Sequence, residues 1–149
     1  NLLYSLQDCF DRVNSFVFID QLTDVTAVFD EHEIDEAVRI VMGEADVHYE
    51  APTDYGETFR HFKRNYMELL TKKTTLIIVG DGRSNYMNPE DTILGQMRDR
   101  CRRVIWLNPE PENLWGTGDS EMMTYATHCH EVRACRNVNQ LISFIEELV

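Results

Sequence analysis

The segment Leu76-Ile77-Ile78-Val79-Gly80-Asp81-Gly82 decides the fold class. Its continuous apolar run predicts a strand buried on both faces, and the glycines around Asp81 predict the turn that ends it. A second run, Val104-Ile105-Trp106-Leu107, stops in the same way at Asn108-Pro109. Apolar residues between the two runs have helical spacing (Ile93, Leu94, Met97 and Cys101). Strand, helix and strand in this order predict a parallel sheet covered by helices.

The flanking sequence extends this pattern. Phe16–Ile19 and the β-branched segment Val25–Phe29 predict two strands, and their link is too short for a parallel crossover. We therefore expect an antiparallel hairpin at one edge, while 131–134 predicts another edge strand. Helical stripes run through 2–13, 34–42, 55–70, 89–101 and 138–148, with Pro89 in the first turn of its helix and a short helix near 120–125. The predicted fold is α/β: one domain, 1–149, with a doubly wound, mostly parallel sheet, helices on both faces and one antiparallel edge strand.

Composition excludes several classes of function. The chain has 26 acidic and 14 basic residues, a formal net charge of −12. This charge argues against nucleic acid or an anionic membrane surface as the main partner. No apolar run approaches the roughly 18 residues of a membrane span, and no signal-peptide pattern is present, so we expect a cytoplasmic protein with reduced cysteines.

The strand ends hold the candidate chemistry. Thr53-Asp54-Tyr55-Gly56, Gly80-Asp81-Gly82 and Asn108-Pro109 should converge at the carboxyl ends of the strands, where open α/β sheets bind ligands. Thr53 and Asp81 are oxygen ligands of the kind that hard cations take. Each also has an ordinary structural interpretation, Thr53 as a helix N-cap and Asp81 as a turn residue.

Signals for other chemistry are weaker. The sequence has no GxSxG elbow, Walker loop or GxGxxG motif. One cluster could hold zinc (His128, Cys129, His130 and Cys135), but its spacing is looser than that of structural zinc sites, which favours a loop and a strand carrying scattered polar residues.

Taken in order, five segments resemble the CoxE-like branch of von Willebrand factor A (VWA) domains over nearly the whole chain. They are 16–20, 24–26, 53–57, 76–82 and 104–110, of which "IWLNPE" at 105–110 is the most specific. The resemblance implies a doubly wound sheet with an antiparallel edge strand, in agreement with the pattern above.

VWA domains commonly carry a metal-ion-dependent adhesion site (MIDAS), which combines a DxSxS loop, a Thr and an Asp from three loops. The Thr matches Thr53 and the Asp matches Asp81, whereas the DxSxS loop has no match. The resemblance implies that the first strand and this loop lie upstream of Asn1. We therefore expect Mg²⁺, or another divalent cation, in the complete domain and none held by residues 1–149 alone.

The resemblance implies a non-enzymatic protein-interaction module. CoxE-like proteins are usually paired with MoxR-type AAA+ ATPases and are thought to help metal insertion or maturation of a client enzyme. Two alternatives stay open: a small α/β hydrolase acting through Asp81, or an interaction domain without metal.

The resemblance implies that the first strand lies between the strands matched by Phe16–Ile19 and Leu76–Val79. Without that strand, the backbone hydrogen-bonding groups on the two facing edges would lack partners. Three arrangements would satisfy these two edges: an upstream strand, direct pairing of the neighbours, or a homodimer that pairs exposed strand edges.

Overall fold

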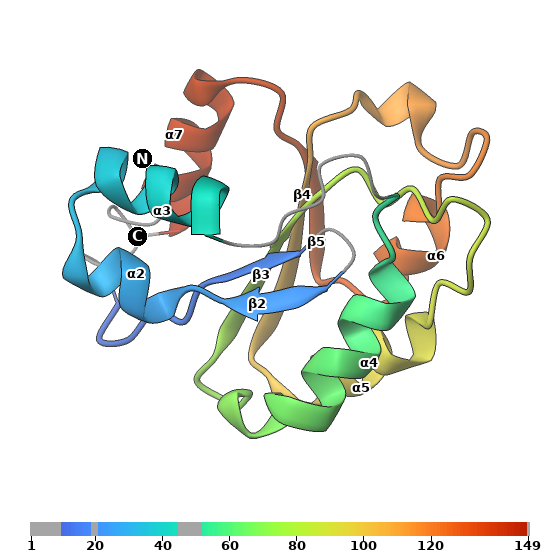
Figure 1. Cartoon of the computed structure of the whole chain (residues 1–149). Coiled ribbons are helices and arrows are strands. Elements are labelled where there is room, and N and C mark those ends of the chain that lie inside the picture. Colours follow the sequence, from blue (N-terminus) through green and yellow to red (C-terminus); the bar gives the residue numbers. More distant parts are fainter. Residues whose placement is uncertain (1–9, 19–20, 45–51, 149) are drawn as a thin grey trace.

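The computed structural model describes residues 10–18, 21–44 and 52–148. Its centre is a three-stranded parallel sheet in the order β3-β4-β5 (Figure 1), formed by Thr75–Val79, Arg103–Asn108 and Glu131–Ala134. Strand β4 is covered on both faces, and its residues 104–108 are fully buried. Burial on both faces is why β4 reads as a continuous apolar run, and the predicted parallel core is confirmed.

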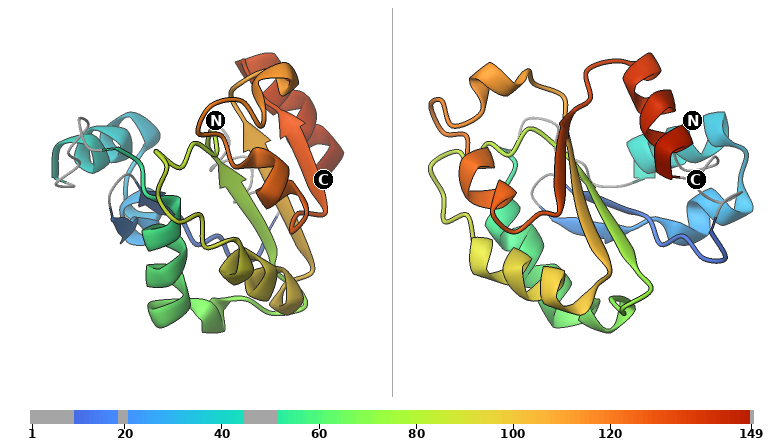
Figure 2. Two further views of the ribbon diagram at one scale, coloured as in Figure 1. Left: turned by 90° about the vertical axis from the view of Figure 1, so that its right-hand side faces the viewer. Right: turned by 180° about the vertical axis from the view of Figure 1, so that it is seen from behind.

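Helices cover both faces of this sheet (Figure 2). On one face, the main core cluster joins the sheet to α4 (Tyr55–Asn65), α5 (Asp91–Arg100) and α6 (Met122–Ala126), with the short 3₁₀ helix η1 (Met67–Leu69) after α4. On the other face, α7 (Val138–Leu148) packs through Phe144 on Ile105 and Leu107. A second 3₁₀ helix, η2 (Glu112–Leu114), follows β4. In the described part of the chain, no helix is long and apolar enough to cross a bilayer.

An antiparallel hairpin lies on the β3 side of this sheet (Figures 1 and 2). Strand β1 (Phe16–Phe18) pairs with β2 (Leu22–Asp24), with Phe16 opposite Asp24 and Phe18 opposite Leu22. An antiparallel hairpin is therefore present as predicted, but its second strand is Leu22–Asp24 and not Val25–Phe29, and it forms a sheet of its own. Ile19 lies outside the described residues, as does most of the helix predicted at 2–13.

The prediction that Val25–Phe29 is a strand is wrong, because helix α2 occupies Thr26–Glu31. The Asp24 Oδ1 atom accepts the Thr26 N–H at 2.9 Å and turns the chain out of β2. Val25 and Phe29 lie one helical turn apart and are buried against Ala37, which belongs to α3 (Ile34–Glu44). Tertiary packing thus overrides the β-propensity of this segment.

Two helix boundaries also differ from the prediction. Helix α5 begins at Asp91 rather than Pro89, because Glu90 adopts a left-handed conformation (φ 50°) as its N-cap. Helix α4 stops at Asn65 and the chain continues as η1, so the helix predicted over 55–70 is interrupted.

Strands β1 and β3 do not pair with each other. They belong to separate sheets, so direct closure of the two edges is not found among the described residues. Phe16 and Phe18 of β1 and Leu76 of β3 nevertheless pack against the same main core cluster. The two edges therefore border one hollow at the carboxyl end of β3.

Candidate functional site

This hollow, called here the strand-end cleft, has a volume of about 400 Å³. Its lining comes from β1, from the loop before α4, and from the ends of β3 and β4: Phe16, Val17, Phe18, Thr53, Tyr55, Val79, Gly80, Asp81 and Pro109. The fold therefore brings Thr53 and Asp81, which are 28 positions apart in sequence, to the same cleft. This is the edge of the sheet at which the sequence predicts a ligand site.

Hydrogen bonds hold Asp81 by its backbone and by one carboxylate oxygen. The buried Asn108 side chain donates from Nδ2 to the Asp81 carbonyl oxygen at 2.9 Å. The Asp81 Oδ1 atom accepts from the Tyr55 hydroxyl at 3.2 Å and from the Arg83 N–H at 2.9 Å. Within the described part of the chain, Oδ2 has no partner. One oxygen orients the carboxylate and the other is available to a ligand.

Tyr55 is the buried support of this arrangement. Its hydroxyl accepts the Gly82 N–H at 3.1 Å while it donates to Asp81. Its ring packs on Trp106, with ring centres 5.6 Å apart. Burial, reinforced by the negative charge of Asp81, raises the pKa of Tyr55 far above its ordinary value, so the hydroxyl stays protonated and keeps donating.

Gly80 allows the close approach of this hydroxyl to the end of β3. A Cβ atom at Gly80 would lie 2.2 Å from the Tyr55 hydroxyl oxygen. The Gly80 carbonyl oxygen accepts the Trp106 indole N–H at 2.8 Å. Gly80, the first glycine of "VGDG", therefore has a packing role as well as ending the strand.

The neighbouring Asp54, and not Thr53, is the N-cap of α4. Its Oδ1 atom accepts the Glu57 N–H at 2.9 Å. The N-cap interpretation of Thr53 is therefore wrong, and the Thr53 hydroxyl has no hydrogen-bond partner among residues 10–18, 21–44 and 52–148. The Thr53 carbonyl oxygen accepts the Asn85 Nδ2 amide at 3.1 Å, which ties this loop to the loop after β3.

The two available oxygen atoms of the cleft fit part of the coordination shell of a hard cation. Thr53 Oγ1 and Asp81 Oδ2 are two oxygens of the type that Mg²⁺ takes, and Mg²⁺ also keeps several waters. No group of three or more His, Cys, Asp or Glu side chains that could hold a metal occurs in the described ranges. A complete six-oxygen shell therefore needs ligands besides the two that these ranges supply.

The potential zinc ligands at 128–135 have other roles. His128 Nε2 lies 3.0 Å from Asp91 Oδ2, whereas His130 Nδ1 accepts the Val104 N–H at 3.0 Å. The Cys129 thiol donates to the Tyr125 carbonyl oxygen. These contacts favour the structural interpretation of the segment.

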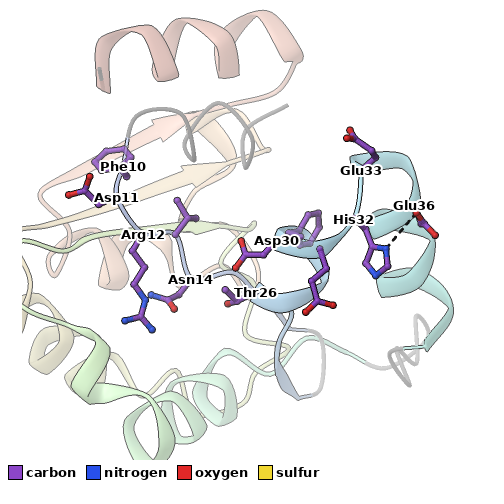
Figure 3. A pocket seen from close by; sticks show the side chains of 12 residues that line it. Phe10, Asp11, Arg12, Asn14, Thr26, Asp30, His32, Glu33 and Glu36 are labelled. Atoms are coloured by element: carbon purple, nitrogen blue, oxygen red, sulfur yellow. Dashed lines mark ion pairs between the residues drawn. The ribbon is translucent and has the colours of Figure 1, made fainter.

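A larger hollow, of about 780 Å³, lies away from the strand ends, between residues 10–14 and helices α2 and α3. Figure 3 shows Asp11, Asp30, Glu33 and Glu36 spread around it, with His32 directed to Glu36 at 3.5 Å. Its lining comes from two short stretches of sequence, 10–14 and 26–36. Because these carboxylates do not gather at one point, this hollow is a weaker candidate than the strand-end cleft.

Sequence reasoning placed Tyr55 and Asn108 at the strand ends but did not predict that they support Asp81. Tyr55 has helical core spacing in the sequence, and nothing local indicates that its hydroxyl reaches Asp81. Asn108 carries a usable signal, because a polar residue directly after a buried strand lies at the ligand-binding edge. The Asn85 contact to Thr53 depends on a loop conformation that the sequence pattern does not specify.

Comparison with protein families gives one match. The model described as "VWA domain containing CoxE-like protein" matches residues 1–144. Neither the curated proteins nor the solved structures include a match to this chain. The family match covers nearly the whole sequence and agrees with the α/β architecture and with the hairpin beside the parallel sheet. The chain therefore belongs to the family of CoxE-like proteins that contain a VWA domain.

Proposed function

We propose that this protein is a non-enzymatic interaction module that binds a protein partner at the strand-end cleft through a divalent cation. The observation that carries the proposal is the meeting of Thr53 and Asp81 in one cleft, each with an oxygen that no described residue occupies. When bound there, Mg²⁺ would supply an open position for a carboxylate of the partner. A protein of net charge −12 could then bind an acidic residue locally.

The residues around the cleft have defined parts in this proposal. Tyr55 and the Arg83 N–H hold one Asp81 oxygen, which leaves the second directed to the ligand. Asn108 fixes the backbone of the same residue. Because Asp54 caps α4 in its place, the Thr53 hydroxyl is available as a neutral ligand. We propose that the remaining ligands are oxygens that the described residues do not supply.

Family membership supports a more specific role. We propose that the partner is a MoxR-type AAA+ ATPase or a client enzyme, that the protein works in the cytoplasm, and that it assists maturation or metal insertion of that client. The ATPase would supply the work, while the cleft would supply recognition.

A hydrolase acting through Asp81 is the weaker alternative. The described partners of the Asp81 carboxylate are a phenol hydroxyl and a backbone N–H, and the raised pKa of Tyr55 keeps that phenol protonated, so it cannot accept a proton as a general base. Neither group would activate a nucleophile or a water molecule beside Asp81.

The test uses purified full-length protein and a purified MoxR-type ATPase from the same organism. Affinity is measured by calorimetry in Mg²⁺ and in EDTA, for wild type, Thr53→Ala and Asp81→Ala. The matched control is Asp99→Ala, which removes an exposed carboxylate from the far end of α5. We expect the first two variants to stay folded and lose Mg²⁺-dependent affinity, and the control to bind normally. Thr53→Ala should melt like wild type, whereas Asp81→Ala should melt somewhat earlier because the Tyr55 hydroxyl and the Arg83 N–H lose their acceptor.

Two results would contradict this proposal in different ways. Equal affinity in EDTA would favour metal-independent interaction. Hydrolytic activity that disappears in Asp81→Ala would favour the enzyme.

A further inference from the structure

The loop after β3 holds two consecutive non-glycine residues in a left-handed conformation. Asn85 has φ 51° and Tyr86 has φ 60°. Asn tolerates this region, whereas a bulky aromatic residue is rarely found there. Such strain persists only where surrounding contacts determine the backbone, and it concentrates at ligand-binding sites.

The contacts that fix this loop come from the segment before α6. Asp119 Oδ2 accepts the Asn85 N–H at 2.9 Å, and the Asp119 carbonyl oxygen accepts the N–H of the buried Ser84 at 3.0 Å. The Ser84 hydroxyl accepts the Tyr86 N–H at 3.1 Å. Arg83 adds ion pairs of 2.8 Å to Glu110 and 3.0 Å to Asp119. The backbone of Tyr86 is therefore held in place although its side chain is not.

The Tyr86 side chain is directed to solvent. It is 84% exposed, more than any other large hydrophobic residue in the described part of the chain. No ring contact or hydrogen bond of this side chain is present among the described residues. A fixed backbone that presents a free aromatic ring is typical of an interface anchor, because Tyr offers a large contact area with few rotamers to order.

The loop that carries Tyr86 contacts the lining of the strand-end cleft. The adjacent residue, Asn85, donates its side-chain amide to the Thr53 carbonyl oxygen at 3.1 Å, and Thr53 lines the cleft. A partner residue that enters the cleft therefore brings its neighbours in sequence toward Tyr86.

Charge near the loop indicates what those neighbours are. Arg83 is already paired with Glu110 and Asp119, and Arg60 is paired with Glu90. Each of these cations already has a carboxylate partner, so neither adds an unpaired positive charge that would favour an acidic neighbour. An uncharged apolar or aromatic side chain is the group that an exposed phenol ring would bind best here.

We propose that Tyr86 is a specificity-determining contact, which recognises an apolar or aromatic residue flanking the carboxylate that the cleft captures. The partner segment thus carries an Asp or Glu with an apolar or aromatic side chain close to it in sequence. This inference rests on the proposed function, since it requires the carboxylate to bind beside Thr53.

The test uses full-length protein and two sets of nine-residue peptides with random flanks, one with a central Asp and the other with a central Asn. Tyr86→Asn removes the ring but keeps a residue that tolerates the left-handed region, whereas Tyr86→Phe keeps the ring. Ile142→Ala, which shortens a half-exposed apolar side chain on α7, is the matched control.

In Mg²⁺, wild type should select peptides with an apolar residue near the central Asp. Tyr86→Asn should bind them about tenfold more weakly or worse, while Tyr86→Phe and Ile142→Ala bind like wild type. Unchanged, Mg²⁺-dependent binding by Tyr86→Asn would overturn this inference alone. Equal selection of Asn peptides, or binding that survives EDTA, would overturn the proposed function together with it, as would no binding of either set.

Discussion

Replacing Tyr55 by Phe removes one oxygen atom from the support of Asp81. The ring should keep its packing against Trp106 and Tyr125. The change deletes the 3.2 Å bond to Asp81 and leaves the Gly82 N–H without the partner that it has at 3.1 Å. A lost hydrogen bond costs about 0.5–1.5 kcal/mol, and a buried donor left unpaired costs about 1–3 kcal/mol.

We therefore expect Tyr55→Phe to lower the free energy of unfolding by about 2 kcal/mol. In a chain of this length that is a fall of roughly 4–8 °C in Tm. Urea denaturation followed by circular dichroism measures the first quantity, and a thermal scan measures the second. Mg²⁺-dependent partner binding should also weaken, because Asp81 keeps only the Arg83 N–H on its Oδ1 atom.

The matched control is Tyr125→Phe. The Tyr125 hydroxyl is buried and donates to the Pro89 carbonyl oxygen at 2.9 Å, but it does not touch Asp81. This variant should lose about 0.5–1.5 kcal/mol of stability and keep its partner affinity. If Tyr55→Phe unfolds and binds like wild type, the Tyr55 hydroxyl does not hold the Asp81 carboxylate, and the reasoning fails.

Two further sets of substitutions test the close packing at Gly56 and the lowered pKa of His130. Gly56→Ala should lower the free energy of unfolding by about 1–3 kcal/mol, because the new Cβ would lie 2.1 Å from the Asn88 carbonyl oxygen. Gly43→Ala, whose new Cβ would have nothing within 4 Å, should leave the free energy of unfolding unchanged or raise it. The urea midpoints of the two variants check this prediction, and similar midpoints would contradict it. Desolvation, together with the positive charges of Arg98 and Arg103, lowers the pKa of His130. The neutral ring therefore stabilises the fold above the ordinary histidine pKa, and this contribution is lost as the pH falls through the lowered value. The free energy of unfolding of wild type and of His130→Gln is measured between pH 8 and about 5. Its dependence on pH should differ between the two proteins below about pH 6.5, and parallel curves would show that the pKa of His130 is not lowered in the folded state.

Local sequence pattern predicted the strands of the parallel core. Strand β4 has a continuous apolar run because it is buried on both faces, and such a run is visible without knowledge of the fold, whereas β3 is only partly buried and Val79 at its end is exposed. The pattern failed at Val25–Phe29, where β-branched residues suit a strand but a helical turn buries them against α3. Propensity is a weak signal in a short segment, and packing against another element decided the outcome.

The candidate site was predictable only in part. Thr53 could be placed at the strand ends because it precedes a predicted helix, and Asp81 because it follows a predicted strand. The Tyr55 support and the Asn85 contact join residues 26 and 32 positions apart through side chains, which no local spacing encodes. The left-handed backbone at Asn85 likewise depends on Asp119, which belongs to a different loop.

The position of a bound cation tests the central claim most directly. Paramagnetic Mn²⁺, added in small amounts to ¹⁵N-labelled full-length protein, broadens the amide signals of residues close to where it binds. The signals of Thr53 and Gly82 should broaden first, and Asp81→Ala should abolish the effect. Broadening centred on the acidic segment 30–36, or broadening at Thr53 that persists in Asp81→Ala, would contradict it.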